Sequence, residues 1–123
     1  MTARLRIELF VRNVDAFVDF YTRVLGFAVR TDGRDSAHPY VAVRRDDIEV
    51  GASPSWEPVD PVVRSVPAGV ELVIEVDDLD AEERRVTEAR WPIESPKQQR
   101  PWGLTDFRVH DPDGYYIRLT TRQ

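Results

Sequence analysis

The stretch PWGLTDFRVHDPDGYYIRLT, residues 101–120, decides the fold of this chain. Phe107 and Val109 alternate with Arg108 and His110, which is the two-residue period of a β-strand. The residues DPDG at 111–114 are typical of a tight turn, because proline presets φ and glycine tolerates a positive φ. Residues 116–119 then resume an extended pattern. The stretch therefore predicts a hairpin, and a lone hairpin needs further strands to be stable in water.

An internal repeat supplies those strands. Residues 5–16, LRIELFVRNVDA, align without a gap with residues 70–81, VELVIEVDDLDA. Both segments alternate apolar and polar residues and then enter a helical pattern, so Leu5 and Val70 are expected to face the helices. Residues 41–50 also repeat the strand, turn and strand of the C-terminal hairpin in a weaker form. We therefore expect two copies of one βαβββ unit.

The helices have recognisable boundaries in the sequence. Asn13 is a suitable N-cap for the first helix, which Gly26 ends, and three aspartates cap and precede the second helix. Phe17, Phe20, Tyr21, Val24 and Leu25 recur at helical spacing and are expected to pack in the core. Residues 27–30 are expected to form a short strand, and residues 31–39 and 92–103 are expected to form loops.

Three motifs in this order resemble the vicinal oxygen chelate superfamily, which includes glyoxalase I, extradiol dioxygenases and the fosfomycin- and bleomycin-resistance proteins. The motifs are FYTRVLGF at 20–27, VDDLDA at 76–81 and DPDG at 111–114. The resemblance covers nearly the whole chain. It implies an α+β fold in which two βαβββ modules form curved mixed sheets around a concave groove. The PWG of residues 101–103, followed by DPDG and Arg118, looks most like the bleomycin-resistance branch, whose members bind a drug without metal or catalysis.

The domain organisation follows from the same pattern. We expect one domain over residues 1–123, with modules at 4–51 and 69–121 joined by a linker at 52–68. Residues 52–69 hold four of the nine prolines, at positions 54, 58, 61 and 67. Proline stiffens a linker into an extended path. Trp56 in this linker is expected to cover a ligand pocket, to anchor a subunit contact or to pack on the surface.

Composition excludes several functional classes. The formal net charge is -5, whereas binding to nucleic acid requires a basic face. The chain has no cysteine, which removes disulfides and thiolate chemistry and favours a cytoplasmic location. No apolar run approaches the length of a membrane span, and the N-terminus lacks the apolar core of a secretory signal. We therefore expect neither a nucleic-acid partner nor a membrane partner.

The resemblance also implies where a metal would be bound. Enzymes of the superfamily take metal ligands from the first and last strands of each module, which here are Arg6, Glu49, Glu71 and Arg118. A two-residue shift in the alignment would replace Arg6 with Glu8. Arginine has no lone pair to offer a cation, so we expect no metal and no other cofactor. Two carboxylates and two guanidinium groups would instead form a neutral, ion-paired cluster.

The sequence therefore indicates a non-catalytic small-molecule binding protein, in which acidic and aromatic groups suit a planar or cationic, antibiotic-like ligand. An enzyme of the same fold is the alternative, either metal-dependent through Glu8, Glu49, Glu71 and His110 or metal-free with a glutamate as general base. A protein-interaction module is a third class, without support in the sequence. We expect a homodimer, because two-fold dimers are usual in the resembling family and common among soluble proteins. No catalytic residue is assigned. The candidate ligand-binding residues are Arg6, Glu8, Phe10, Glu49, Trp56, Glu71, Glu75, Trp102, His110 and Arg118.

Overall fold

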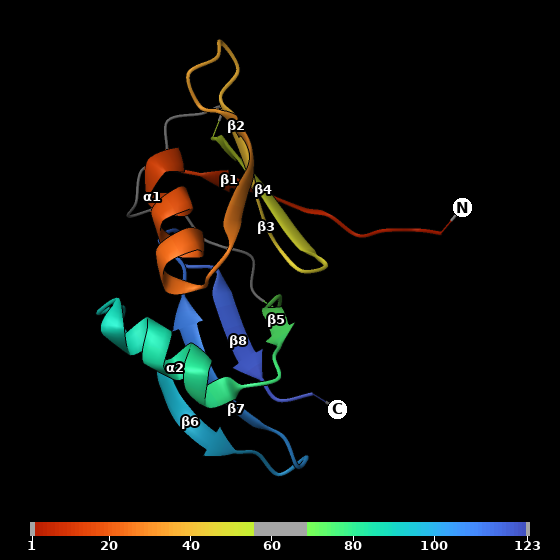
Figure 1. Cartoon of the computed structure of the whole chain (residues 1–123), viewed down its shortest axis with the longest axis vertical. Helices are drawn as coiled ribbons and strands as arrows, with labels where there is room; N and C mark the ends of the chain where they lie inside the picture. The colour runs from red at the N-terminus through yellow and green to blue at the C-terminus, as the bar shows by residue number, and fades with distance from the viewer. Residues whose placement is uncertain (1, 56–68, 123) are drawn as a thin grey trace. The chain divides into compact units, whose positions relative to one another are not determined.

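The computed structural model describes residues 2–55 and 69–122, and Figure 1 shows the course of the chain. The chain divides into two units, Met1–Arg64 and Ser65–Gln123, and each is described by itself. Both units have the element order βαβββ and contain a four-stranded mixed sheet. The α+β class and the internal repeat predicted from the sequence are confirmed.

The first unit contains β1 (Ile7–Val11), α1 (Val14–Asp19), the π-helix η1 (Phe20–Val24), β2 (Ala28–Gly33), β3 (Tyr40–Arg45) and β4 (Ile48–Pro54). The strand order in its sheet is β1-β4-β3-β2. β1 is parallel to β4, and the other two pairs are antiparallel. The last strand of the unit, β4, therefore lies next to the first strand, β1. The two edge strands of the sheet are β1 and β2.

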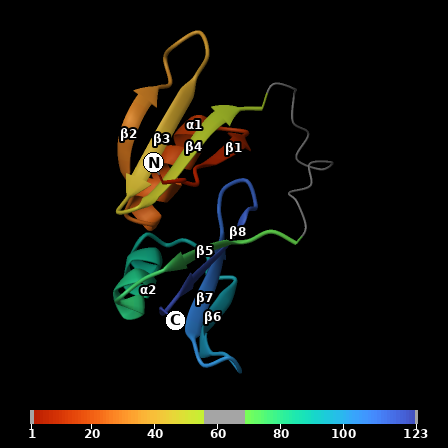
Figure 2. The ribbon, with the colours of Figure 1, turned by 90° about the vertical axis from the view of Figure 1, so that its right-hand side faces the viewer.

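The second unit repeats this topology with β5 (Leu72–Glu75), α2 (Leu79–Glu88), β6 (Ser95–Gln99), β7 (Thr105–His110) and β8 (Tyr116–Thr120). Its strand order is β5-β8-β7-β6, with β5 parallel to β8. The C-terminal hairpin predicted from residues 101–120 is the β7–β8 pair, in which Phe107 lies opposite Leu119. Figure 2 shows this unit from a second direction.

The predicted helix boundaries are confirmed. The side chain of Asn13 accepts a hydrogen bond from the amide of Ala16 at 3.0 Å, and Asp78 does the same for Ala81 at 3.0 Å. These bonds satisfy amides at the helix start that have no partner within the helix. Gly26 has a φ of 76°, which a residue with a side chain rarely adopts, and it follows the end of the first helical segment.

Aromatic side chains of the first helical segment form the core of the first unit, as expected. The ring of Tyr21 lies 4.6 Å from that of Phe17, 5.0 Å from that of Phe20 and 5.7 Å from that of Phe27, measured between centroids. All four residues are buried. They pack with one face of the sheet, which carries Leu9, Val11, Val41, Val43, Val50 and Ala52.

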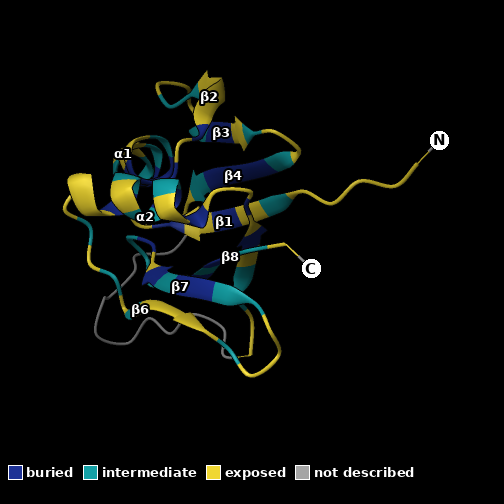
Figure 3. Ribbon diagram, turned by 60° about the horizontal axis from the view of Figure 1, so that its bottom comes forward, coloured by how far each residue is buried: buried dark blue, intermediate teal, exposed yellow. Residues whose placement is uncertain are grey.

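The second unit has the same construction with fewer aromatic residues. Ile74, Phe107, Val109, Ile117 and Leu119 are buried on one face of its sheet, and Val86 of α2 is also buried. Figure 3 shows β7 buried along most of its length, whereas β6 is exposed. The difference is expected, because β7 is paired on both sides and β6 is an edge strand.

Several boundaries differ from the sequence expectations. Leu5 and Val70 are 82% and 60% exposed and precede their strands, so the expectation that they face the helices is wrong. β2 continues to Gly33, into the expected loop. β4 continues to Pro54, beyond the expected module end at residue 51, because its residues from Val50 to Pro54 pair with β1. Residues 95–99 form β6 and not a loop, since an irregularity between Ser95 and Gln98 lets a strand include Pro96.

Candidate ligand-binding site

Each sheet has one face packed with its own helix and one face turned away from it. We call the latter the first open face in the first unit and the second open face in the second. Strand register defines their residues, because residues paired across strands and residues two apart along a strand share a face. The first open face carries Glu8, Phe10, Ala42, Arg44, Glu49 and Gly51. The second carries Val73, Glu75, Asp106, Arg108, His110, Tyr116, Arg118 and Thr120.

Glu8 is at the centre of a hydrogen-bonded group on the first open face. Its Oε1 lies 2.7 Å from Arg6 Nε and accepts a hydrogen bond from the Tyr40 hydroxyl at 2.9 Å. The position opposite Glu8 on β4 is Gly51, and a Cβ atom added there would lie 2.2 Å from Glu8 Oε2 and 2.3 Å from the Tyr40 hydroxyl oxygen. The absence of a side chain at Gly51 therefore leaves the space that the carboxylate and the phenol occupy.

Burial and the neighbouring carboxylate both act on Tyr40. Burial raises its pKa above the ordinary value of 10, and the hydrogen bond to Glu8 raises it further, because a negative charge opposes formation of a phenolate. Tyr40 is therefore a hydrogen-bond donor at neutral pH.

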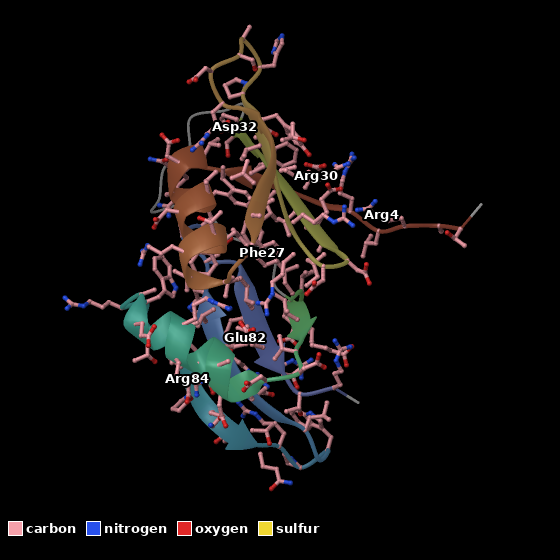
Figure 4. All side chains as sticks on the ribbon, in the orientation of Figure 1. Arg4, Phe27, Arg30, Asp32, Glu82 and Arg84 are labelled. Carbon is pink, nitrogen blue, oxygen red and sulfur yellow. The ribbon has the colours of Figure 1, made fainter. Side chains whose placement is uncertain are left out.

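Glu49 is the second carboxylate of the first open face, and it is buried. Arg30 Nη1 donates to Glu49 Oε1 at 2.7 Å, and Arg4 Nη2 lies 3.6 Å from Glu49 Oε2. A register shift between Val29 and Thr31 places Arg30 at a bulge in β2. A bulge changes the direction of side chains, which explains how Arg30 reaches Glu49 across β3. Figure 4 shows Arg4 and Arg30 on the side of the sheet away from α1.

The second open face carries two arginine residues, Arg108 and Arg118. Arg118 Nη2 lies 2.8 Å from Glu71 Oε1, at the start of the parallel β5–β8 pair. Arg108 lies directly opposite Arg118 on the neighbouring strand. The Arg108 guanidinium carbon is 5.9 Å from the centroid of the Tyr116 ring, and the Tyr116 hydroxyl donates to Glu94 Oε2 at 2.7 Å.

Asp106 is fully buried at one end of the second open face. Its Oδ1 accepts hydrogen bonds from Arg100 Nε at 2.9 Å and from Arg108 Nε at 3.4 Å, and Arg100 Nη2 lies 2.8 Å away. Burial raises the pKa of Asp106, but the hydrogen bonds from the two arginines outweigh this effect, so the pKa lies below its ordinary value of 3.8. Asp106 is therefore ionised at neutral pH and holds Arg100 in place.

Aromatic residues lie at the ends of the strands. Phe10 of β1 is 52% exposed, and Trp102 in the turn between β6 and β7 is 56% exposed. The ring of His110, at the end of β7, is 5.1 Å from that of Tyr116. Trp56 lies outside the described residues. Phe10 and Trp102 are thus exposed aromatic residues, and ligand contact at Trp102 stays a prediction.

Within each unit, the residues of the predicted four-residue cluster take part in ion pairs. Arg118 pairs with Glu71, whereas Glu49 pairs with Arg30, and Arg6 pairs with Glu8. Arg6 precedes β1, whereas Glu8 lies within β1 opposite Gly51 of β4. Glu75 is exposed on the second open face.

Sequence reasoning missed four residues of these faces: Arg30, Tyr40, Asp106 and Arg108. Arg30 was missed because the bulge in β2 interrupts the alternation of side chains. Tyr40 depends on a contact with a residue 32 positions earlier. Arg108 and Asp106 lie two and four positions before His110 on β7, so the alternation of side chains would have placed all three on the same face.

The donor set of the two open faces does not fit a divalent cation. Glu8, Glu49 and Glu71 each have a guanidinium nitrogen within 2.8 Å, and a cation would have to displace it. Within residues 2–55 and 69–122, no three His, Cys, Asp or Glu side chains are grouped so that they could hold a metal ion. In the same residues, no helix combines the length and the apolar character needed to cross a membrane.

Comparison with known proteins agrees with this architecture. The sequence profile of the Glyoxalase/Bleomycin resistance protein/Dioxygenase superfamily matches residues 4–119. No curated protein matches the chain. TioX from Micromonospora sp. ML1 is 24% identical with a TM-score of 0.79, over 99% of this chain and 100% of TioX.

Two further solved structures are similar. UcmS2 is 24% identical with a TM-score of 0.78, over 99% of this chain and 100% of UcmS2. A bleomycin resistance determinant encoded on the transposon Tn5 is 22% identical with a TM-score of 0.76, over 99% of each chain. At these identities the structures show a shared fold.

Proposed function

We propose that this chain, which belongs to the glyoxalase/bleomycin resistance protein/dioxygenase superfamily, binds a small molecule without changing it chemically. The observation that carries the proposal is the state of the carboxylates on the open faces. Those that a metal-dependent or acid–base mechanism would use are already hydrogen-bonded to arginine or tyrosine, whereas large aromatic side chains are exposed.

The hydrogen-bonding of Glu8 argues against a role as general base. A base must accept a proton from its substrate at an available oxygen. Glu8 Oε1 is already in contact with two donors, Arg6 and Tyr40. Glu49 is buried and in contact with Arg30. These contacts give both carboxylates a structural role in keeping the open face ordered.

The exposed groups suit a planar or cationic ligand. Phe10 and Trp102 can stack on an aromatic ring, with their faces about half exposed. The side chain of Glu8 is 34% exposed and Glu75 is exposed, so both can meet a positive group of the ligand. The fold shared with a bleomycin resistance determinant supports an antibiotic-like molecule as the ligand.

The proposal includes a homodimer in the cytoplasm. Each sheet ends in edge strands, and unpaired edges favour association with another sheet. Symmetric dimers are the commonest soluble oligomers. Light scattering gives the mass directly, and a monomer at all concentrations would remove the dimer from the proposal while leaving the binding function.

The experiment that tests the function is a titration of the protein with planar and cationic antibiotics, including glycopeptides. Tryptophan fluorescence reports binding, and mass spectrometry of the recovered compound reports any reaction. The proposal predicts saturable quenching by at least one compound, which is then recovered unchanged. A new product from any compound would make the protein an enzyme and contradict the proposal.

A further inference from the structure

Two arginines face each other on the second open face. Arg108 of β7 and Arg118 of β8 are paired in register, and neighbouring residues on adjacent strands have Cβ atoms only about 4.5–5.5 Å apart. Like charges directly opposite each other on a sheet are destabilising. Such a pair persists where anions compensate for it, so the positions of the surrounding carboxylates decide what the pair can bind.

Asp106 and Glu71 are carboxylates that contact the pair. Asp106 makes its short contacts, 2.8 and 2.9 Å, with Arg100 and only long ones, 3.4 and 3.5 Å, with Arg108. Glu71 lies beyond Arg118, before β5, and contacts one terminal nitrogen of its guanidinium. Glu75 is further along β5, in register with Thr120. Both guanidinium groups therefore keep donors that these carboxylates do not occupy.

Arg118 provides a second and independent observation. Within the described part of the chain, its Nε is a buried nitrogen without a hydrogen-bond partner. A buried donor left unsatisfied is destabilising, and more so when it belongs to a charged group. The Arg118 side chain as a whole is 21% exposed. The acceptors of the described residues therefore leave part of this guanidinium group unsatisfied.

The surroundings of the pair are aromatic. The Arg108 guanidinium lies near the Tyr116 ring, and the His110 ring packs against the same tyrosine. Hydrogen bonding of Tyr116 to Glu94 keeps the tyrosine in place, and a planar group can lie along it. A ligand entering here meets two guanidinium groups and a ring within one short segment of the β7–β8 hairpin.

We propose that Arg108 and Arg118 together bind an oxyanion, a carboxylate or a phosphate, carried by a planar group of the ligand. Guanidinium groups bind both oxyanions through two parallel N–H···O bonds, and two adjacent arginines can each supply one or more donors. The inference rests on the proposed function and refines its ligand: besides any positive group, the molecule carries an oxyanion next to a ring.

The test uses three small probes of matched shape, benzoate, phenyl phosphate and benzamidinium. Each is titrated into the full-length protein in a buffer low in chloride and free of phosphate, and the side-chain Nε–H signals of Arg108 and Arg118 are followed by NMR. Benzoate and phenyl phosphate distinguish a carboxylate ligand from a phosphate ligand. Benzamidinium has the same ring and the opposite charge.

Saturable shifts of both arginine signals with benzoate or phenyl phosphate are expected, and none with benzamidinium. Arg108→Gln should weaken binding of the oxyanion probe at least tenfold. The contacts of Arg108 to Asp106 are long, so this substitution is a mild change to the fold. Arg118→Lys, which keeps the charge and loses the planar fork, should also weaken binding of the probe. Arg84→Gln, which changes an exposed arginine of α2, should leave affinity within twofold (Figure 4).

Absence of a response to both oxyanions, or a response to benzamidinium alone, would overturn the inference. Equal affinity in Arg108→Gln and in the native protein would do the same. These results are separable from failure of the proposed function, because an antibiotic that binds and is recovered unchanged would still support binding without chemistry.

Discussion

Replacement of Asp106 with asparagine tests whether buried ion pairs hold the second open face together. The side chain of Asp106 is fully buried, and those of Arg100 and Arg108 are only 13% and 20% exposed. Asparagine keeps the size of the side chain but removes the charge. Two guanidinium groups would then face a neutral amide in a site that water reaches poorly.

The size of the effect follows from the contacts. Two charge-assisted contacts to Arg100, at 2.8 and 2.9 Å, account for most of it, and each such bond contributes about 1.5–3 kcal/mol. Breaking a buried ion pair costs about 3–5 kcal/mol. We expect a loss of about 3 kcal/mol, at the lower end of this range, because both arginines keep some access to water.

Asp19→Asn is the matched control. Asp19 contacts Arg23 at 2.9–3.2 Å, much as Asp106 contacts Arg100, but the two side chains are 54% and 48% exposed. An exposed pair four residues apart on a helix contributes much less than a buried pair, because water screens its charges. Equal chemistry and different burial should thus give losses that differ severalfold.

Urea unfolding measures both variants. With an m-value of about 2 kcal/mol/M, a loss of 3 kcal/mol lowers the midpoint by about 1.5 M. Trp91 lies in the same unit as Asp106, so its fluorescence follows the relevant transition.

The same variant has a defined pH dependence. Because the folded-state pKa of Asp106 is below 3.8, its contribution is fully present above that value and is lost as the pH falls through the folded-state pKa. The difference between native protein and variant should therefore shrink below about pH 4. A difference no larger than that of Asp19→Asn at pH 7, or one that stays constant to pH 3, would refute the reasoning.

Four further predictions concern the other groups of the open faces. Glu49→Gln should cost about 1 kcal/mol in urea unfolding, less than Asp106→Asn because Arg30 is half exposed, and a loss above 3 kcal/mol would contradict this. Gly51→Ala should displace the Glu8 carboxylate and so lower the pKa of Tyr40, which an ultraviolet titration would show as ionisation of a tyrosine at a lower pH. An unchanged titration would show that the contact between Glu8 and Tyr40 is unimportant. Trp102→Ala should weaken a bound planar ligand by about 1–3 kcal/mol in calorimetry, and equal affinity would remove this residue from the site. Addition of Zn²⁺, Ni²⁺ or Mn²⁺ should leave the melting temperature unchanged, whereas a rise that saturates at one equivalent would indicate a metal site.

Local sequence patterns were sufficient for much of the fold. Asn13, Asp78 and Gly26 define helix ends through bonds and dihedral angles that involve only a few neighbouring residues, so they could be read from the chain. The alternation around Phe107 gave the C-terminal hairpin, and the gapless repeat gave the second copy of the unit. β6 was missed because Pro96 argues against a strand, and only the pairing with β7 overcomes that local preference.

The candidate site was harder to predict because its partners are distant in sequence. Glu8, Glu49 and Arg118 were placed on the open faces from strand parity and from the family resemblance. The contact between Glu8 and Tyr40 depends on the register between strands, which places Gly51 where a side chain would block it. The contact between Glu49 and Arg30 depends on the bulge in β2. Side-chain alternation within one strand contains neither kind of information.

The most direct test of the account is a crystal structure of the protein with the antibiotic that binds it most tightly. The account predicts an unmodified ligand on an open face, with an oxyanion between Arg108 and Arg118 or a ring against Trp102 or Phe10, and with Glu8 and Glu49 still bonded to their arginines. A metal ion held by those carboxylates, or a ligand bound away from both open faces, would contradict it.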